Sequence, residues 1–353
     1  MATCIFCGKN PESKTKEHVF PIWLLEHTSN LNAKGAFGYD LSKDPPEPRI
    51  IPFKSFQFPA CDQCNQNFKT LENKTSKIIK KMNNLEAVSE IELNILLNWF
   101  DKVRRGLFLG FNMLDSEYLK VYPSFYIQTG IGLTDRVLHI NIFNENTKIL
   151  AARGCDTFIF KLMPSCFLLI IDNLCFINMA TSYLFARRLG FPYTSKIFYK
   201  DSGKGHTVIL KRGKERVMYP LIRRMFKMNG IQVYQPMFPL KSLGEYVHYY
   251  ESQYVKERSL DWNNGVGRIF INRRGQLKLY EKDSEWIDET FYDQRTLIKQ
   301  ASIQMFNAQR YLLENFVSSP ELLSVSMKKR FNKTIQMCLS NNNSVLKKIN
   351  EEI

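Results

Sequence analysis

Four of the eight cysteines form two Cys-x2-Cys pairs, Cys4 with Cys7 and Cys61 with Cys64. Four thiolates at this spacing are the ligand set of a closed tetrahedral zinc site, which holds a fold together. The first pair lies at a Phe-Cys-Gly turn that suits a zinc knuckle. We therefore predict a structural zinc ion bound by these four side chains. The remaining cysteines, at 155, 166, 175 and 338, follow no such spacing.

Residue types suited to phosphodiester hydrolysis stand between and after these pairs. Glu17 and His18 are adjacent in the segment 16–21, Lys-Glu-His-Val-Phe-Pro, and Asn65 directly follows the last cysteine of the pairs. Carboxylate and amide oxygens suit a hard divalent cation such as Mg²⁺ or Mn²⁺. A neutral imidazole, with an ordinary pKa near ~6.5, can take a proton from water. Lys69 would share the helical face of Asn65, and is either a phosphate contact or a solvated lysine.

The segment from Cys4 to about residue 72, including Phe68 and the Leu71-Glu72 pair, resembles the zinc-stapled branch of the HNH (ββα-metal) endonucleases. In that branch an acidic residue precedes the catalytic histidine on a hairpin, and a His or Asn follows the last cysteine at the start of a helix. The resemblance implies a treble-clef or ββα-metal module with structural Zn²⁺ and a catalytic Mg²⁺ or Mn²⁺. It implies that Glu17 and Asn65 hold the catalytic metal and that His18 is the general base.

Two neighbouring positions differ from the family pattern or have an open role. The Asn that often orients the catalytic histidine is missing from the segment 54–60, so Gln57 or Ser55 takes this role or it is vacant. Glu72 lies seven residues after Asn65, where it would either bind the metal through water or form an ion pair with Lys16 or Lys69. We expect the ion pair.

The chain is strongly basic, with a formal net charge of +15 from 49 Lys and Arg against 34 Asp and Glu. Such a surface attracts a polyanion such as nucleic acid, although an anionic membrane or an acidic protein would be favoured by the same field. A basic run over 196–227 would follow a phosphate backbone or form a solvated hairpin face. No segment has the pattern of a secretory signal or a membrane span, so we expect a reducing cytoplasm and no membrane partner.

We expect three parts: a nuclease module at 1–84, an α+β body at 85–320 for substrate or partner recognition, and a polar helical tail at 321–353. The Pro- and Gly-rich insertion 31–59 is predicted to be a surface loop with a short strand near 53–58. Apolar residues at helical spacing over 86–109 predict a helix that docks the module to the body. His27 has no partner at ligand spacing, and we expect an ordinary surface residue.

The body is expected to hold an antiparallel sheet with helices nearby. Segment 294–316 is predicted to be helical, and 327–353 to be either a short helix pair or a partly ordered tail. Apolar or alternating runs between turn residues predict strands at 125–131, 137–143, 157–162, 167–171, 197–199, 207–210, 217–219 and 268–271.

These features predict a metal-dependent DNA endonuclease, with RNA as an alternative substrate. HNH modules joined to unrelated bodies occur in restriction, mobile-element and anti-phage defence systems. The resemblance therefore implies an effector whose body senses an activating protein or a small molecule. The competing hypothesis is a non-catalytic zinc module that binds nucleic acid within a larger complex. That hypothesis predicts salt-sensitive binding that Glu17→Ala leaves intact.

Overall fold

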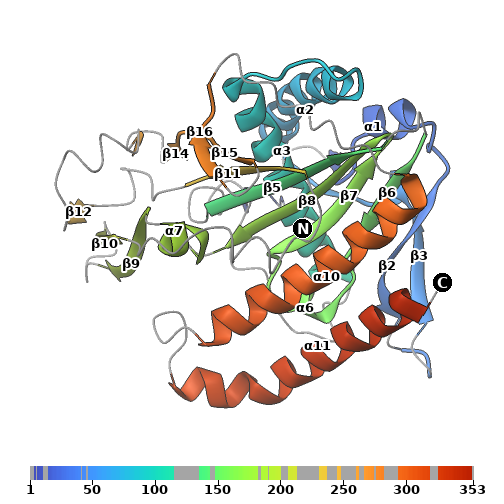
Figure 1. The fold of residues 1–353 in the computed structure, drawn as a ribbon. Coiled ribbons are helices and arrows are strands. Elements are labelled where there is room, and N and C mark those ends of the chain that lie inside the picture. Colours follow the sequence, from blue (N-terminus) through green and yellow to red (C-terminus); the bar gives the residue numbers. More distant parts are fainter. Residues whose placement is uncertain are drawn as a thin grey trace.

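A seven-stranded antiparallel sheet forms the centre of the structure (Figure 1). The computed structural model describes residues 4, 6–10, 15–40, 42–44, 47–114, 135–143, 148–181, 184–189, 191–199, 206–212, 230–236, 245–247, 260–261, 266–273, 276–281, 293–318 and 325–351. In spatial order the strands of the sheet are β16 (Gln276–Leu279), β15 (Phe270–Arg273), β11 (Ile231–Gln235), β5 (Asp135–Ile142), β8 (Leu174–Thr181), β7 (Cys166–Ile171) and β6 (Leu150–Arg153).

Both faces of this sheet are buried, which explains why β7 and β8 are almost continuously apolar. In β7, Phe167 and Leu169 belong to the hydrophobic cluster that includes α3 (Glu90–Leu114), whereas Leu168 and Ile170 belong to the cluster that includes α10 (Gln294–Ser318). Figure 1 shows α10 crossing one face of the sheet, with α3 on the other. The molecule therefore has a three-layer arrangement around the sheet.

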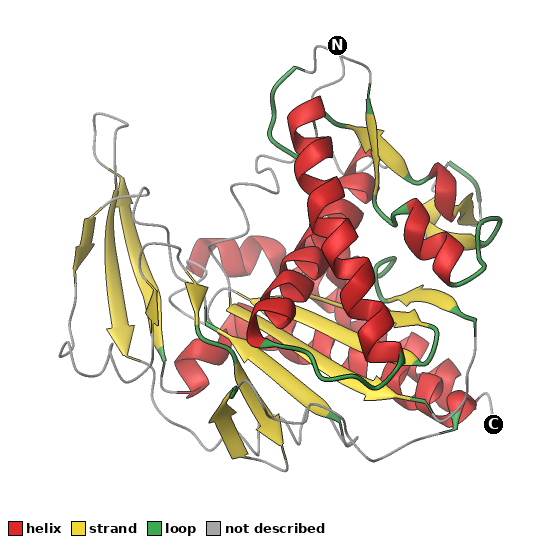
Figure 2. Ribbon diagram, turned by 90° about the horizontal axis from the view of Figure 1, so that it is seen from above, coloured by secondary structure: helices red, strands yellow, loops and turns green. Residues whose placement is uncertain are grey.

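The N-terminal region is built on a two-stranded ribbon followed by a long helix. Strand β1 (Lys16–His18) pairs antiparallel with β4 (Gln57–Pro59), and α2 (Asp62–Asn83) begins just after β4. The chain between the two strands forms α1 (Ile22–His27), the hairpin of β2 (Lys34–Asp40) and β3 (Glu47–Pro52), and the 3-10 turn η1 (Phe53–Ser55). Helix α2 packs against α3, and Figure 2 shows long helices crossing in front of the central strands.

One face of α3 is shaped to receive the β1–β4 ribbon. Gly106 lies against Val19, and Gly110 lies against the rings of Phe56 and Phe58, so closely that a Cβ atom on Gly110 would fall 2.4 Å from the Phe58 ring. Residues four apart in a helix share a face, and Lys102 stands one turn before Gly106. This face therefore brings Lys102 to the end of the ribbon.

The remaining described elements lie outside the central sheet. Helix α11 (Val325–Glu351) packs on α10, and α6 (Phe158–Leu162) contacts both. A separate three-stranded sheet contains β9 (Pro192–Tyr199), β10 (His206–Arg212) and β12 (Glu245–Val247). The chain also forms α7 (Leu184–Leu189) and the pair β13 (Leu260–Asp261) and β14 (Val266–Gly267).

Most predicted elements are confirmed, including the mixed α and β content, the antiparallel sheet and the C-terminal helices. The prediction of a strand at 157–162 is wrong, because the Thr157 hydroxyl accepts a hydrogen bond from the Phe160 amide and starts α6 there. The insertion 31–59 is not a plain surface loop, since it forms the β2–β3 hairpin and buries Phe37, Phe53 and Phe56. The tail is one continuous helix rather than a helix pair. The predicted strands at 125–131 and 217–219 lie outside the described residues.

Within the part of the chain that the structure describes, no helix combines the length and apolar character needed to cross a membrane.

Candidate functional site

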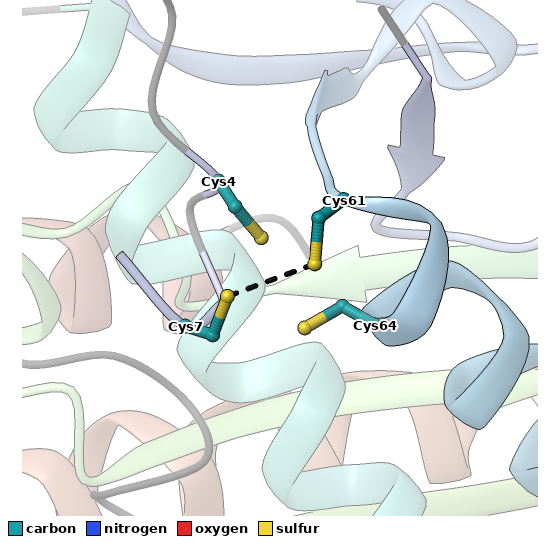
Figure 3. A group of neighbouring side chains, drawn as sticks. All are labelled: Cys4, Cys7, Cys61 and Cys64. Atoms are coloured by element: carbon teal, nitrogen blue, oxygen red, sulfur yellow. Dashed lines mark hydrogen bonds between the residues drawn. The ribbon is translucent and has the colours of Figure 1, made fainter. Parts of the chain in front are cut away.

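The four cysteines of the two pairs meet in one cluster. Their sulfur atoms all lie within 4.8 Å of one another, and the Sγ atoms of Cys7 and Cys61 are 3.7 Å apart (Figure 3). A tetrahedral ZnS4 site with Zn–S near ~2.3 Å places its sulfur atoms about 3.8 Å apart. All four thiols are free of disulfides. The cluster therefore has the ligand type, number and spacing that a structural zinc ion requires.

Local structure explains how chain segments that are distant in sequence converge on this cluster. The first pair sits in a tight turn in which the Gly8 amide donates to the Cys4 carbonyl at 2.9 Å, and Gly8 has φ +79°, which favours glycine. Phe6 packs edge-on against Phe68 of α2, with ring centroids 4.7 Å apart. The second pair lies at the N-terminus of α2, where Cys61 is the N-cap residue.

The pKa values of the cluster thiols are shifted in different directions. Burial raises the pKa of Cys7 and of Cys64, because a buried thiolate without a counter-charge is unfavourable. Burial also raises the pKa of Cys61, but hydrogen bonds with the Cys64 backbone and the neighbouring thiols lower the pKa by more than burial raises it. The net shift of Cys61 is therefore downward. A divalent cation would stabilise all four thiolates and release their protons on binding.

A second site lies beside the cysteine cluster, where β1 meets the first turns of α2. The predicted residues Glu17, His18, Asn65 and Lys69 all line one pocket of about 510 Å³. Its other walls are Thr15, Pro21, Ile22, Trp23, Asp62, Gln66 and Glu72. The ribbon and the helix thus bring together residues that are about fifty positions apart in the sequence. For example, Asn65 and Lys16 are 49 residues apart and are joined by a hydrogen bond.

His18 is partly buried at the end of β1, in an environment that favours the neutral imidazole. Burial lowers the pKa of His18, Glu17 opposes this shift, and Lys102 adds to it. A hydrogen bond with the backbone of Lys54 holds the ring. The Lys54 backbone is therefore the contact that orients the ring, a role for which the sequence left Gln57, Ser55 or no residue as alternatives.

Asn65 is held with a defined orientation. Its amide nitrogen donates to the Lys16 carbonyl at 3.4 Å, which ties the start of α2 to β1. With the nitrogen so engaged, the amide oxygen is the atom left to accept a hydrogen bond or bind a cation. Lys69 is exposed one helical turn further along and also lines the pocket.

Lys102 is completely buried and contacts residues that line this pocket. Its Nζ atom lies 2.7 Å from Glu17 Oε1, 2.7 Å from Glu72 Oε1 and 2.7 Å from the backbone oxygen of His18. The same ammonium lies 5.6 Å from the centroid of the Phe68 ring. Three oxygen acceptors for three N–H donors satisfy the ammonium group fully. Lys102 thereby fixes the backbone of His18 and the carboxylate of Glu17 together.

The charges in this triad are strongly coupled. Burial alone would lower the pKa of Lys102, but the carboxylates of Glu72 and Glu17 raise it above the ordinary value, so the ammonium stays charged. Burial raises the pKa of Glu72 to about 7, and Lys102 opposes this shift. Near neutral pH the Glu72 carboxyl group is therefore protonated for part of the time.

Two sequence expectations are wrong at this site. Glu72 forms an ion pair, but its partner is Lys102 and not Lys16 or Lys69. His27 is not an ordinary surface residue, because its Nε2 atom lies 3.1 Å from Asp172 Oδ2, at the hairpin between β7 and β8. Asn83 also contacts the His27 ring at 2.9 Å. His27 therefore joins α1 to the central sheet.

Lys102 is the functional residue that sequence reasoning missed. A signal was present, because Gly106 and Gly110 follow Lys102 at intervals of four and mark a helix face that another element approaches closely. The lysine at the end of such a face is enclosed by that element. The spacing of the glycines, however, does not predict that Glu17 and Glu72 are the partners of Lys102.

Among the described residues, the four-cysteine cluster is the only group of three or more Cys, His, Asp or Glu side chains with metal-binding spacing. The comparisons with known proteins are negative: no family model, curated protein or solved structure matches this chain. We therefore infer function from the residues of the two sites.

Proposed function

We propose that this protein is a metal-dependent endonuclease of the HNH (ββα-metal) kind, with His18 as the general base. The observation that supports the proposal is the pocket itself. Glu17, His18, Asn65 and Lys69 come from two separate elements and line one cavity of about 510 Å³ beside the cysteine cluster. The antiparallel pairing of β1 with β4, followed by α2, is the arrangement expected for the core of such a module.

The residues present fit a hard divalent cation such as Mg²⁺ or Mn²⁺. The Glu17 carboxylate binds Lys102 through Oε1, and a carboxylate offers about four acceptor directions, so lone pairs remain for a metal. The Asn65 amide oxygen is the second protein ligand. Mg²⁺ is commonly held by one or two protein oxygens together with waters and substrate phosphates. A bound cation would offset the charge on the phosphate and on the leaving 3′ oxygen.

His18 performs the proton transfer in this proposal. Its lowered pKa keeps the imidazole neutral at pH 7, and the Lys54 backbone holds the ring. The imidazole accepts a proton from water while the water oxygen forms a bond to phosphorus and the bond to the 3′ oxygen breaks. The products then carry 5′ phosphates. Lys69, exposed at the rim of the pocket, binds a phosphate oxygen of the substrate.

DNA is the substrate we propose, with RNA as the alternative. The support is the net charge of +15, which favours a polyanionic partner over a neutral one. In this proposal the central sheet and its helices form the body that recognises a substrate, an activating protein or a small molecule.

Cleavage of supercoiled plasmid, linear duplex, single-stranded DNA and RNA, with Mg²⁺ or Mn²⁺, tests the proposal. We expect His18→Ala to lower cleavage by at least about 100-fold, because general base catalysis contributes 10²–10⁴-fold. His27→Gln is the matched control, since His27 lies outside the pocket and its loss should leave cleavage intact below the unfolding temperature. Zinc content is measured for each variant. Undiminished cleavage by His18→Ala would show that the base is assigned wrongly.

A non-catalytic, nucleic-acid-binding zinc module is the second candidate. The observation in its favour is Lys102, whose ammonium already neutralises the carboxylate of Glu17 without a metal. This candidate predicts binding without turnover by the wild-type protein, and binding that Glu17→Ala leaves intact. The endonuclease proposal instead predicts that Glu17→Ala abolishes cleavage and retains binding.

A further inference from the structure

One exposed face of α2 carries a row of lysines that begins at the candidate site. Lys69, Asn73, Lys77 and Lys80 follow one another at intervals of three or four residues, so they share one side of the helix. We call these four residues the α2 stripe. All four are exposed, and they lie opposite the face that buries Ile78, Ile79 and Met82.

The lysines of the α2 stripe have no counter-charge among the described residues. No ion pair within that part of the chain involves Lys69, Lys77 or Lys80. The neighbouring Lys81 behaves differently, because it turns away from the stripe and pairs with Glu92 of α3 at 2.8 Å. Asp62, in the first turn of α2, is the only acidic residue of that helix on this face. The stripe is therefore a run of positive charge that the fold leaves open.

The α2 stripe is continuous with the pocket that holds His18. Lys69 and the preceding exposed residue on the same face, Gln66, both line that pocket. With a rise of about 1.5 Å per residue, Lys80 lies roughly 16 Å along the axis from Lys69. Each strand of a duplex advances about 3.4 Å per nucleotide, so the stripe matches the axial length of roughly five nucleotides.

We propose that the α2 stripe binds the phosphate backbone of the nucleic acid next to the bond that enters the pocket. The lysine ammonium groups and the amide nitrogen of Asn73 can donate hydrogen bonds to phosphate oxygens. Such contacts position a nucleic acid without reading its sequence. The stripe thus sets the direction in which the substrate leaves the pocket. The location of the scissile bond rests on the proposed function, but the binding by the stripe is measured without cleavage.

The test is the salt dependence of binding to a fluorescent duplex of random sequence, with no divalent cation added so that the substrate stays intact. We expect the double variant Lys77→Gln/Lys80→Gln to bind several-fold more weakly and to reduce the slope of log K against log[salt] by about 1.8, or 0.9 per lost phosphate contact. The matched control removes the same charge from α11, with Lys333→Gln/Lys348→Gln. Both of these lysines are exposed, on the opposite side of the sheet from α2 (Figure 1).

A smaller slope in the α2 variant alone supports the stripe. Equal slopes in the two double variants, or no binding of duplex, single-stranded DNA or RNA by the wild-type protein, would overturn it. The two proposals fail separately. Cleavage by the wild-type protein, together with an unchanged slope in the α2 variant, would contradict the proposal for the α2 stripe and support the nuclease proposal. A smaller slope in the α2 variant, without cleavage under Mg²⁺ or Mn²⁺, would support the α2 stripe and contradict the nuclease proposal.

Discussion

The ammonium of Lys102 and the carboxylate of Glu17 form a buried ion pair, with Nζ and Oε1 2.7 Å apart. Lys102 belongs to α3 and Glu17 to β1, so this pair joins the long central helix to the strand that ends in His18. The same ammonium binds the backbone oxygen of His18. The position of the candidate base therefore depends on a side chain outside the first 84 residues.

Lys102→Met should destabilise the fold strongly, because it leaves two buried carboxyl groups without their cation. The expected loss is about 3–5 kcal/mol in the free energy of unfolding, measured by urea denaturation at pH 8. Lys81→Met is the control, since its ion pair with Glu92 is partly exposed and should contribute under about 1 kcal/mol. Equal losses in the two variants would contradict the importance of the buried triad.

The loss caused by Lys102→Met should depend on pH. Burial raises the pKa of Glu72 from 4.5 to about 7, so the folded protein resists ionisation of this group as pH rises between those values. Without Lys102 that resistance grows, because the carboxylates lose their nearest positive charge. We therefore expect the stability difference from wild type to be smaller at pH 5, where the Glu72 carboxyl group takes up a proton, than at pH 8. A difference that stays constant over this range would contradict the assignment.

Cys61→Ser should remove zinc from the purified protein and lower its melting temperature. A structural zinc site contributes directly to folding, and a hydroxyl is a poor replacement for a thiolate ligand. Metal analysis and thermal unfolding measure the two effects. Cys338→Ser is the control, because Cys338 is buried on α11 away from the cluster and should keep the wild-type zinc content. Retention of zinc by Cys61→Ser would exclude this cysteine as a ligand.

Two glycines one turn apart on α3 should respond oppositely to alanine. A Cβ on Gly110 would fall 2.4 Å from the Phe58 ring and 2.8 Å from the Phe56 ring, so Gly110→Ala should cost about 1–3 kcal/mol. A Cβ on Gly106 would meet Val19 at 3.4 Å, an ordinary contact, and Gly106→Ala should stabilise the helix by up to about 1 kcal/mol. Chemical denaturation of both variants tests the pair. Similar effects would mean that α3 does not approach the ribbon closely.

His27→Ala should weaken the link between α1 and the central sheet. Asp172 has a side chain only 4% exposed, and loss of a hydrogen-bonding partner to such a group costs about 1–3 kcal/mol. Lys148→Met is the control, because Lys148 contacts the same carboxylate from a side chain that is 55% exposed and should contribute under about 1 kcal/mol. Urea denaturation would contradict this interpretation if the lysine variant were the less stable of the two.

The four-cysteine cluster could be predicted from the sequence because the spacing within each pair is local. Two Cys-x2-Cys pairs each fit one turn, and a cluster of four thiols follows once the pairs meet. The candidate residues Glu17, His18, Asn65 and Lys69 were chosen from the resemblance of the segment 4–72 to HNH endonucleases and from helical spacing, and the structure places all four on one pocket. An alternating apolar pattern likewise predicted β5, and a continuous apolar run predicted β7.

Contacts between distant segments were decided by the tertiary structure alone. In the sequence, Lys102 cannot be told apart from any other lysine in a helix. Its ion pairs with Glu17 and Glu72 form only because α3 packs against the ribbon and encloses the Lys102 side chain. The orientation of His18 comes from a backbone group of Lys54, which no residue type encodes. Residue types and short spacings thus determined which candidate ligands and which candidate base this chain offers. Packing determined their protonation, orientation and partners, because burial and long-range approach are properties of the folded chain and not of local sequence.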